Sequence, residues 1–249
     1  MRRLILAILI GFMAPSWVLA ESEEGPKLQN ANVDLNDRVG LQNGARLFLN
    51  YCVSCHSASM MRYNRAAADL GIPESKMKAN LMFTTEKIGE TMTVAMQGAD
   101  AEAWFGIRPP DLSVIARSRG DDWLYSFLQG FYADPTRPTG VNNAYLPNVA
   151  MPHVLWELQG IQRPVYGTEK DETTGKSVQV LEGLETDKPG KMTEVEFKKS
   201  LRNLVSFLVY LGEPAKLVRY RLGVAVLLFL SVLLVAAYLV KREYWKDVH

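Results

Sequence analysis

Two cysteines and a histidine near the start of the chain are the residues whose types and spacing are best suited to chemistry. The segment is Cys52-Val53-Ser54-Cys55-His56, and the chain contains no further cysteine. Two intervening residues let both thiols reach one edge of a porphyrin, where each adds across a vinyl group. The histidine that follows is then placed to ligate the iron. The pattern predicts one covalently attached haem c, held by Cys52 and Cys55 and ligated by His56.

Other uses of a close cysteine pair agree less well with the rest of the chain. A thioredoxin-type redox pair follows a strand, whereas the segment before Cys52 does not have the pattern of a strand. A structural zinc site needs a second pair of ligands, and the chain offers only two cysteines and three histidines. An exchange disulfide is the alternative that the residues leave open.

An iron bound by one histidine needs a sixth ligand or has an open site. The candidates before the C-terminal apolar segment are one histidine and eight methionines: His153, Met60, Met61, Met77, Met82, Met92, Met96, Met151 and Met192. Met151 is favoured because it lies in a loop between Pro147 and Pro152, where a restricted backbone can hold one side chain against a porphyrin. A thioether ligand favours reduced iron and raises the redox potential.

Helical periodicity surrounds the motif. Over Val39–Tyr51, apolar residues recur on one helical face, so an amphipathic helix is expected to deliver the motif. Thr193 and Glu196 have the spacing of a capping box, and the helix that they begin is expected to end at Gly212. A further helix is expected after Asp121-Asp122, with Trp123, Phe127 and Leu128 on one side.

Strand patterns are few. Residues 162–191 are polar and rich in glycine and charge, and they predict a two-stranded hairpin with Val178–Leu181 as one strand. The expected fold is therefore mainly α, a haem-binding core of the c-type cytochrome kind enlarged by loop insertions, with one C-terminal transmembrane helix.

Both ends of the chain carry apolar segments. Residues 1–20 begin with two arginines and continue into a short apolar stretch, which is typical of a secretory signal peptide; an uncleaved signal anchor is the alternative. Residues 222–240 contain no charge over nineteen positions, about 28 Å as a helix, close to the thickness of a bilayer's hydrocarbon core. Basic and aromatic residues in 241–249 predict a cytoplasmic tail.

These segments divide the chain into an exported haem domain over 21–213, a hinge over 214–221 and one membrane span. Residues 21–215 contain 20 Lys and Arg against 25 Asp and Glu, so the exported part is mildly acidic. Such a balance favours cationic partners and argues against nucleic acid.

Several segments together resemble the cytochrome c1 family of the ubiquinol–cytochrome c reductase complex. Besides the haem motif, the methionine loop and the terminal helix, they are Arg108-Pro109-Pro110-Asp111-Leu112-Ser113, Arg117-Ser118-Arg119 and Trp123-Leu124-Tyr125-Ser126-Phe127-Leu128. The resemblance covers most of residues 35–245. The Pro-Pro-Asp-Leu-Ser stretch is far more particular than the haem motif, which all c-type cytochromes share. Residues 162–191 differ from mitochondrial members, and no function is assigned to them.

The resemblance implies roles for individual residues. Met151 matches the axial methionine, and Pro109 and Pro110 match prolines packed beside the haem. Arg119 and Tyr125 match groups that bond the haem propionates, since a buried carboxylate requires paired donors. A solvated charge at Arg119 and a plain core aromatic at Tyr125 are the alternatives.

The resemblance also implies a function and partners. The chain would take electrons from the Rieske iron–sulfur protein and pass them to a soluble cytochrome c, beside cytochrome b in a bacterial inner membrane, with the haem on the periplasmic side. It would not be catalytic alone. The alternatives are a free-standing anchored cytochrome that feeds a terminal oxidase, and a haem-based sensor with an open sixth site.

Overall fold

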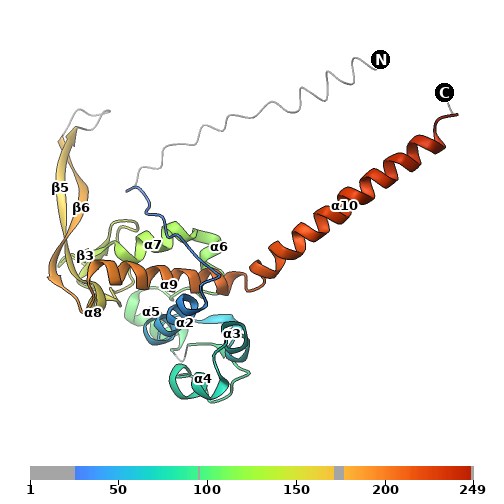
Figure 1. Ribbon diagram of the computed structural model, residues 1–249. Helices are drawn as coiled ribbons and strands as arrows, with labels where there is room; N and C mark the ends of the chain where they lie inside the picture. The colour runs from blue at the N-terminus through green and yellow to red at the C-terminus, as the bar shows by residue number, and fades with distance from the viewer. Residues whose placement is uncertain (1–25, 95, 171–176, 248–249) are drawn as a thin grey trace.

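The computed structural model describes residues 26–94, 96–170 and 177–247, so the predicted signal peptide lies outside the described residues. About 48% of the chain is helical and 17% is in strands, which confirms the mainly α prediction only in part. The helical elements, labelled in part in Figure 1, are α2 (Arg38–Leu47), the π-helical turn η1 (Phe48–Cys52), α3 (Tyr63–Leu70), α4 (Glu74–Leu81), α5 (Gly98–Phe105), α6 (Ile115–Arg119), α7 (Asp121–Gln129), α8 (Trp156–Gln159), α9 (Glu194–Gly212) and α10 (Lys216–Tyr244).

Helix α2 carries the chain into the haem motif, as its periodicity predicts. The side chain of Asp37 accepts a hydrogen bond from Gly40 N at 2.9 Å and so caps the first turn. Leu41, Ala45 and Phe48 are buried, and the Phe48 ring lies 5.6 Å from that of Phe207 on α9. Burying one such side chain stabilises the fold by about 1.5–3 kcal/mol. The motif is therefore attached to a helix that the core holds.

Helices α2 and α9 pack closely because a glycine lies between them. A Cβ added to Gly44 would lie 2.1 Å from the carbonyl oxygen of Asn203 and 2.8 Å from Cβ of Phe207. No larger residue fits this contact without moving one helix.

Helix α9 runs across the middle of the body and contacts α2, α6 and α7 (Figure 1). The predicted capping box is present: the Thr193 hydroxyl accepts from Glu196 N, and the Glu196 carboxylate accepts from Thr193 N. The predicted apolar face is buried, and its residues are Phe197, Leu201, Leu204, Val205 and Leu208. The helix ends at Gly212, as expected.

Three antiparallel pairs supply the strands, more than the sequence predicts. The pairs are β1 (Ala58–Arg62) with β2 (Thr91–Met92), β3 (Phe131–Ala133) with β4 (Val141–Asn143), and β5 (Gly160–Lys170) with β6 (Ser177–Pro189). The first two pairs were not predicted. Their strands are two to five residues long, and such short segments do not show a period of two.

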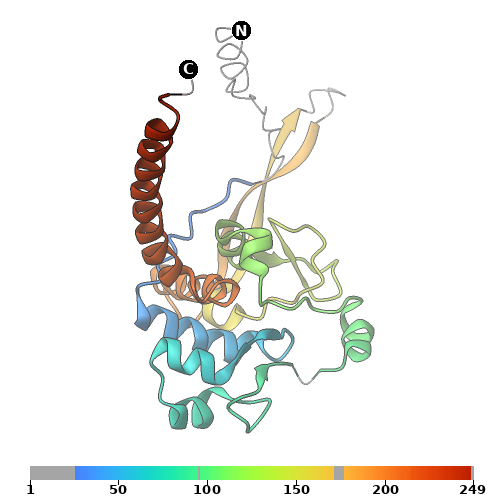
Figure 2. The same cartoon turned by 90° about the vertical axis from the view of Figure 1, so that its right-hand side faces the viewer.

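The hairpin predicted within residues 162–191 is confirmed and is longer than expected. Val178–Leu181 lies in β6, and the two strands pair in register from Gly160 opposite Pro189 to Lys170 opposite Ser177, with two irregularities. The hairpin projects from the body, and β5 contacts β3 (Figure 1). Helix α5 lies apart from α2 and α9 (Figure 2).

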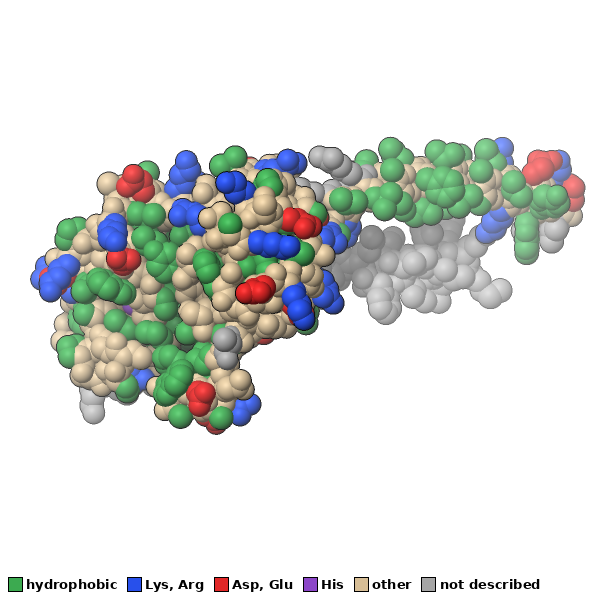
Figure 3. All heavy atoms as spheres, turned by 90° about the horizontal axis from the view of Figure 1, so that it is seen from below, with side chains coloured by type: hydrophobic (Ala, Val, Ile, Leu, Met, Phe, Trp, Pro, Cys, Tyr) green, Lys and Arg blue, Asp and Glu red, His purple; other side chains and the backbone are tan. Residues whose placement is uncertain are grey.

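Helix α10 leaves the body as a single rod. Its segment Val218–Tyr244 is the one helix of the described residues that is long and apolar enough to cross a membrane. It includes the whole of 222–240, and α10 begins inside the 214–221 segment. Apolar side chains cover the rod, and basic and acidic side chains gather at its end (Figure 3).

Candidate functional site

The haem motif is a tight turn at the end of η1. Val53 N donates to Phe48 O at 3.1 Å, an i to i+5 bond that continues the π-helical winding. Cys55 N and His56 N both donate to Cys52 O, at 3.0 and 2.8 Å. These bonds fix the backbone between the two thiols. Wide turns of this kind often occur at functional sites in helices.

Both motif sulfurs are free thiols and both residues are half-buried. Burial, together with the neighbouring charge of Cys55, raises the pKa of Cys52 to about 12. Burial of Cys52 therefore favours its neutral thiol over its thiolate.

The ring of His56 is held through one nitrogen. Its Nδ1 lies 2.7 Å from the carbonyl oxygen of Pro110. Because a carbonyl only accepts, Nδ1 carries the proton and Nε2 keeps its lone pair. Burial lowers the pKa of His56, although the Pro110 carbonyl and the charge of Asp111 act to raise it. This is the arrangement of a metal-ligating histidine, in which the second nitrogen bonds to a carbonyl.

Residues 110–113 cross the chain that follows the motif and bind its backbone. Leu112 N donates to Ser57 O at 2.7 Å, and Met60 N donates to the hydroxyl of Ser113 at 3.1 Å. Ser59 N donates to the carboxylate of Asp111 at 2.9 Å. The family resemblance places Pro110 near a haem, but the sequence does not predict these bonds, because they join residues more than fifty positions apart.

Met151 lies in an irregular loop and is half-buried against the hydrophobic core, as Cys52 is. His153, two residues later, is buried, and its ring stacks on Phe131 at 5.0 Å. Burial lowers the pKa of His153 to about 4, although a bond to the backbone of Gly160 opposes the shift. Within the described residues its Nε2 has no hydrogen-bond partner. The methionine loop thus contains two side chains that could ligate a metal, the thioether of Met151 and the imidazole of His153. Only Met151 is half-exposed.

Arg119 and Tyr125 have other partners in this structure. Arg119 is exposed, and its guanidinium lies 5.1 Å over the ring of Trp123. Tyr125 is 3% exposed, and its hydroxyl donates to Lys198 O at 3.4 Å. Their assignment to haem propionates stays a prediction.

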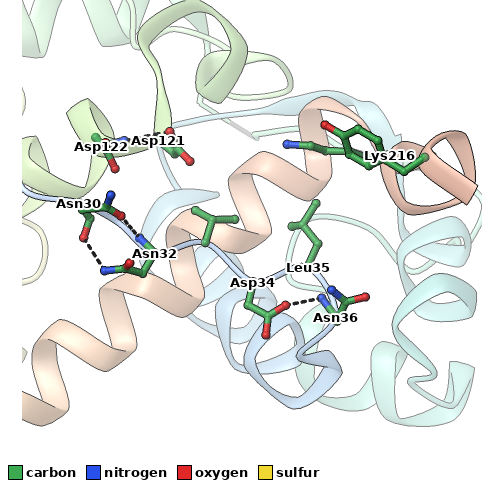
Figure 4. Close-up of a pocket in the computed structure, with 10 residues that line it drawn as sticks. Asn30, Asn32, Asp34, Leu35, Asn36, Asp121, Asp122 and Lys216 are labelled. Carbon is green, nitrogen blue, oxygen red and sulfur yellow. Dashed lines mark hydrogen bonds between the residues drawn. The ribbon is translucent and has the colours of Figure 1, made fainter. Parts of the chain in front are cut away.

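A polar pocket of about 410 Å³ lies where α10 meets the body. Asn30, Asp34, Asp121 and Lys216 are among its lining residues (Figure 4). None of the residues proposed for haem lines it. This pocket is not the haem site.

The chain's own donors fit a covalently attached haem c. Two free thiols stand at the required spacing, and an adjacent imidazole has its Nδ1 occupied and its Nε2 available. A rigid turn and a crossing segment hold all three residues.

Comparison with known proteins identifies the family. The model of the Cytochrome C1 family matches residues 29–248. The chain is 48% identical to a protein named cytochrome c1 from Allochromatium vinosum, with all of both chains covered. It is 44% identical to a Nitrosomonas europaea protein named ammonia monooxygenase gamma subunit, over 99% of this chain and all of that one. It is 25% identical to the cytochrome c1 of Rhodospirillum rubrum, over 85% of this chain and 83% of that one. The chain belongs to the cytochrome c1 family, whose members carry a covalently bound haem c and use it for electron transfer.

Proposed function

We propose that this chain is the haem-bearing subunit of a ubiquinol–cytochrome c reductase, and that it takes single electrons from a Rieske iron–sulfur protein and passes them to a soluble cytochrome c. The bond between His56 Nδ1 and Pro110 O carries the proposal, because it leaves Nε2 as the ligand atom beside two free thiols. The bound haem supplies a one-electron Fe(III)/Fe(II) couple.

Each residue has a distinct task. Cys52 and Cys55 form the two thioether links, and His56 Nε2 is the proximal ligand. Met151 is the sixth ligand, an assignment supported by its half-buried position in a loop that the core restrains. Its thioether favours the reduced state and raises the potential, as a late carrier in an electron-transfer chain requires.

Pro110 holds the proximal imidazole through its carbonyl. Arg119 and Tyr125 are proposed to serve the propionates, which requires Arg119 to leave the ring of Trp123 and Tyr125 to exchange Lys198 O for a carboxylate.

We also propose that α10 anchors the chain in a bacterial inner membrane, with the haem domain in the periplasm and the tail in the cytoplasm. The uncharged segment 222–240 and the basic residues after it support this arrangement. Cytochrome b and the Rieske protein are the expected neighbours in the membrane.

The test is to isolate the complex from its native membrane through a tag on the C-terminal tail, using a mild detergent. We expect the haem to remain on this chain after denaturing electrophoresis. The full chain has a mass of 27.9 kDa, and loss of the predicted signal peptide would lower that mass. We expect cytochrome b and the Rieske protein to copurify, and ubiquinol to reduce soluble cytochrome c. A haem-stained chain that copurifies with an oxidase or a monooxygenase instead would contradict the proposed partners. Carbon monoxide binding to the reduced native protein would favour a sensor.

A further inference from the structure

The methionine loop contains one residue in a backbone conformation that needs support. Asn148, three residues before Met151, has φ of 63°. This left-handed region is open to asparagine but is unfavourable for most side chains. A residue held there bends the chain sharply, so its orientation sets the direction in which the following residues leave.

Arg137 holds Asn148 from the turn of the neighbouring hairpin. Its Nη1 donates to Asn148 Oδ1 at 3.0 Å and its Nη2 donates to Asn148 O at 3.2 Å. One planar guanidinium therefore grips both the side chain and the main chain of the bent residue. Its Nε is buried and has no partner within the described residues.

Asn142 holds Asn148 from the opposite side. The residue is buried on β4, and its Oδ1 accepts from Asn148 N at 2.8 Å. Its Nδ2 donates to Asp134 Oδ2 at 3.0 Å. The N–H, the carbonyl and the side-chain oxygen of Asn148 are thus all bonded to residues of the β3–β4 hairpin.

The hairpin turn itself is fixed, so it can serve as a support. Arg137 N donates to Asp134 O at 3.1 Å and Gly140 N donates to Arg137 O at 2.9 Å. The hydroxyl of Thr136 donates to Asp134 Oδ1 at 2.6 Å. Both ends of the Arg137 backbone are restrained before its side chain reaches the loop.

We propose that Arg137 is a positioning residue for the sixth ligand. Through Asn148, with Asn142 and Asp134 as supports, it holds the loop so that Met151 stays bound to the iron; we call these four residues the Asn148 clamp. The inference rests on the proposed function, because it requires Met151 to be the ligand. An arginine without a structural role would be exposed to solvent and would pair with a carboxylate. Arg137 is instead half-buried and donates hydrogen bonds to an asparagine.

The test compares Arg137→Ala with Arg163→Ala in the full chain within its complex. Arg163 is the matched control, since it is an exposed arginine bonded to Glu185 on the projecting hairpin. Three measurements follow the ligand: the near-infrared methionine–iron absorption, the redox midpoint and carbon monoxide binding to the reduced protein. We expect Arg137→Ala to raise the fraction of haem without methionine about tenfold, the size expected from losing about two hydrogen bonds. Its midpoint should fall, and Arg163→Ala should match the wild type.

Two further variants keep the proposal falsifiable where Arg137→Ala fails to accumulate. Arg137→Lys keeps the charge but loses the fork, so it should recover only part of the wild-type absorption. Asn148→Gly keeps the left-handed backbone and the carbonyl acceptor but removes Oδ1. It should therefore raise the fraction of haem without methionine about threefold.

The double variant Arg137→Ala/Asn148→Gly should have no more haem without methionine than Arg137→Ala alone, because both changes remove bonds of the same clamp. Additive effects of the two changes in the double variant would contradict the proposal. So would Arg137 variants whose methionine absorption and midpoint equal those of Arg163→Ala. Failure of the proposed function is distinguishable, because it would appear in the wild type as missing covalent haem or missing methionine absorption, and it would overturn both.

Discussion

The two segments proposed to ligate the haem, the motif with His56 and the loop with Met151, are held by different kinds of bonds. On the His56 side, the motif folds back on its own backbone and a crossing segment adds main-chain bonds, such as Leu112 N to Ser57 O. On the Met151 side, the bonds come mostly from side chains, above all from Arg137 and Asn142 to Asn148. The His56 (proximal) side therefore depends mostly on the backbone of a local turn, to which Asp111 and Ser113 add side-chain bonds. The Met151 (distal) side depends on a few polar side chains, whose loss we expect to release the loop.

The largest expected effect is on the proximal side. Cys52→Ala/Cys55→Ala removes both thioether links, so no haem should remain on the chain after denaturing electrophoresis. Either single variant keeps one link and should retain stain. Acidified acetone should extract all pigment from the double variant and none from the wild type. A stained double variant would show that the haem is attached elsewhere.

The next effect isolates the distal side. Met151→Leu keeps the volume of the side chain but removes the sulfur, so haem should stay attached while the near-infrared absorption disappears and the midpoint falls. Redox titration of the isolated complex measures the change. An unchanged midpoint would mean that another group, such as the buried His153, ligates the iron. Met192→Leu, half-buried near the start of α9, is the matched control.

A change in the scaffold of the proximal side should lower stability without changing ligation. Gly44→Ala places a methyl group 2.1 Å from Asn203 O and forces α2 away from α9, at a cost of about 1–3 kcal/mol in the free energy of unfolding. Gly89→Ala is the control, since nothing lies within 4 Å of the added Cβ. Urea titration followed by tryptophan fluorescence measures both. The methionine absorption of folded Gly44→Ala should be that of the wild type, and its loss would show that the two sides are coupled.

The smallest expected effect is at the crossing segment. Burial acts to raise the pKa of Asp111, but hydrogen bonds from Ser113 and Ser59 outweigh it and leave the pKa below its ordinary value. Its carboxylate therefore stabilises the folded chain above the unfolded pKa of about 3.9, and the contribution is lost as the pH falls through the lower folded pKa. Asp111→Asn should reduce this pH dependence and destabilise the chain at pH 7 by about 1 kcal/mol.

Acid titration of the unfolding midpoint from pH 6 downward, with exposed Glu86→Gln as the control, measures this effect. An acid limb in Asp111→Asn as steep as in the wild type would show that this carboxylate adds no stability.

The sequence was sufficient for those parts of the molecule that are specified by residues close together in the chain. The helix before Cys52, the capping box at Thr193 and the hairpin around Val178 follow from periodicity and spacing, and the structure has all three. The cysteines of the motif are free thiols and the imidazole is bonded through Nδ1, and their roles at a haem stay predictions.

The remaining features depend on contacts between distant residues. Strand β2 has two residues and exists only because Ala58–Arg62 pairs with it. Pro110, whose carbonyl contacts His56, lies 54 positions further along the chain, and no local pattern marks a carbonyl as a partner. The hydrogen bonds from Arg137 to Asn148 form because the turn of the β3–β4 hairpin contacts the methionine loop. The sequence shows an arginine and an asparagine, and only the fold brings them together.

The join between the body and α10 has a consequence for how electrons travel. Helix α9 ends at Gly212 and α10 begins at Lys216, so three residues separate them, and Arg219 pairs with Glu213 across the join at 2.5 Å. A link of this length spans about 10 Å when extended, less than the radius of gyration of about 16 Å expected for a domain of this size. With α10 in the bilayer as proposed, the domain can neither swing far nor rise from the membrane surface. If the proposed function holds, the redox partners must therefore move to and from this chain, because its anchor keeps the haem domain near the membrane.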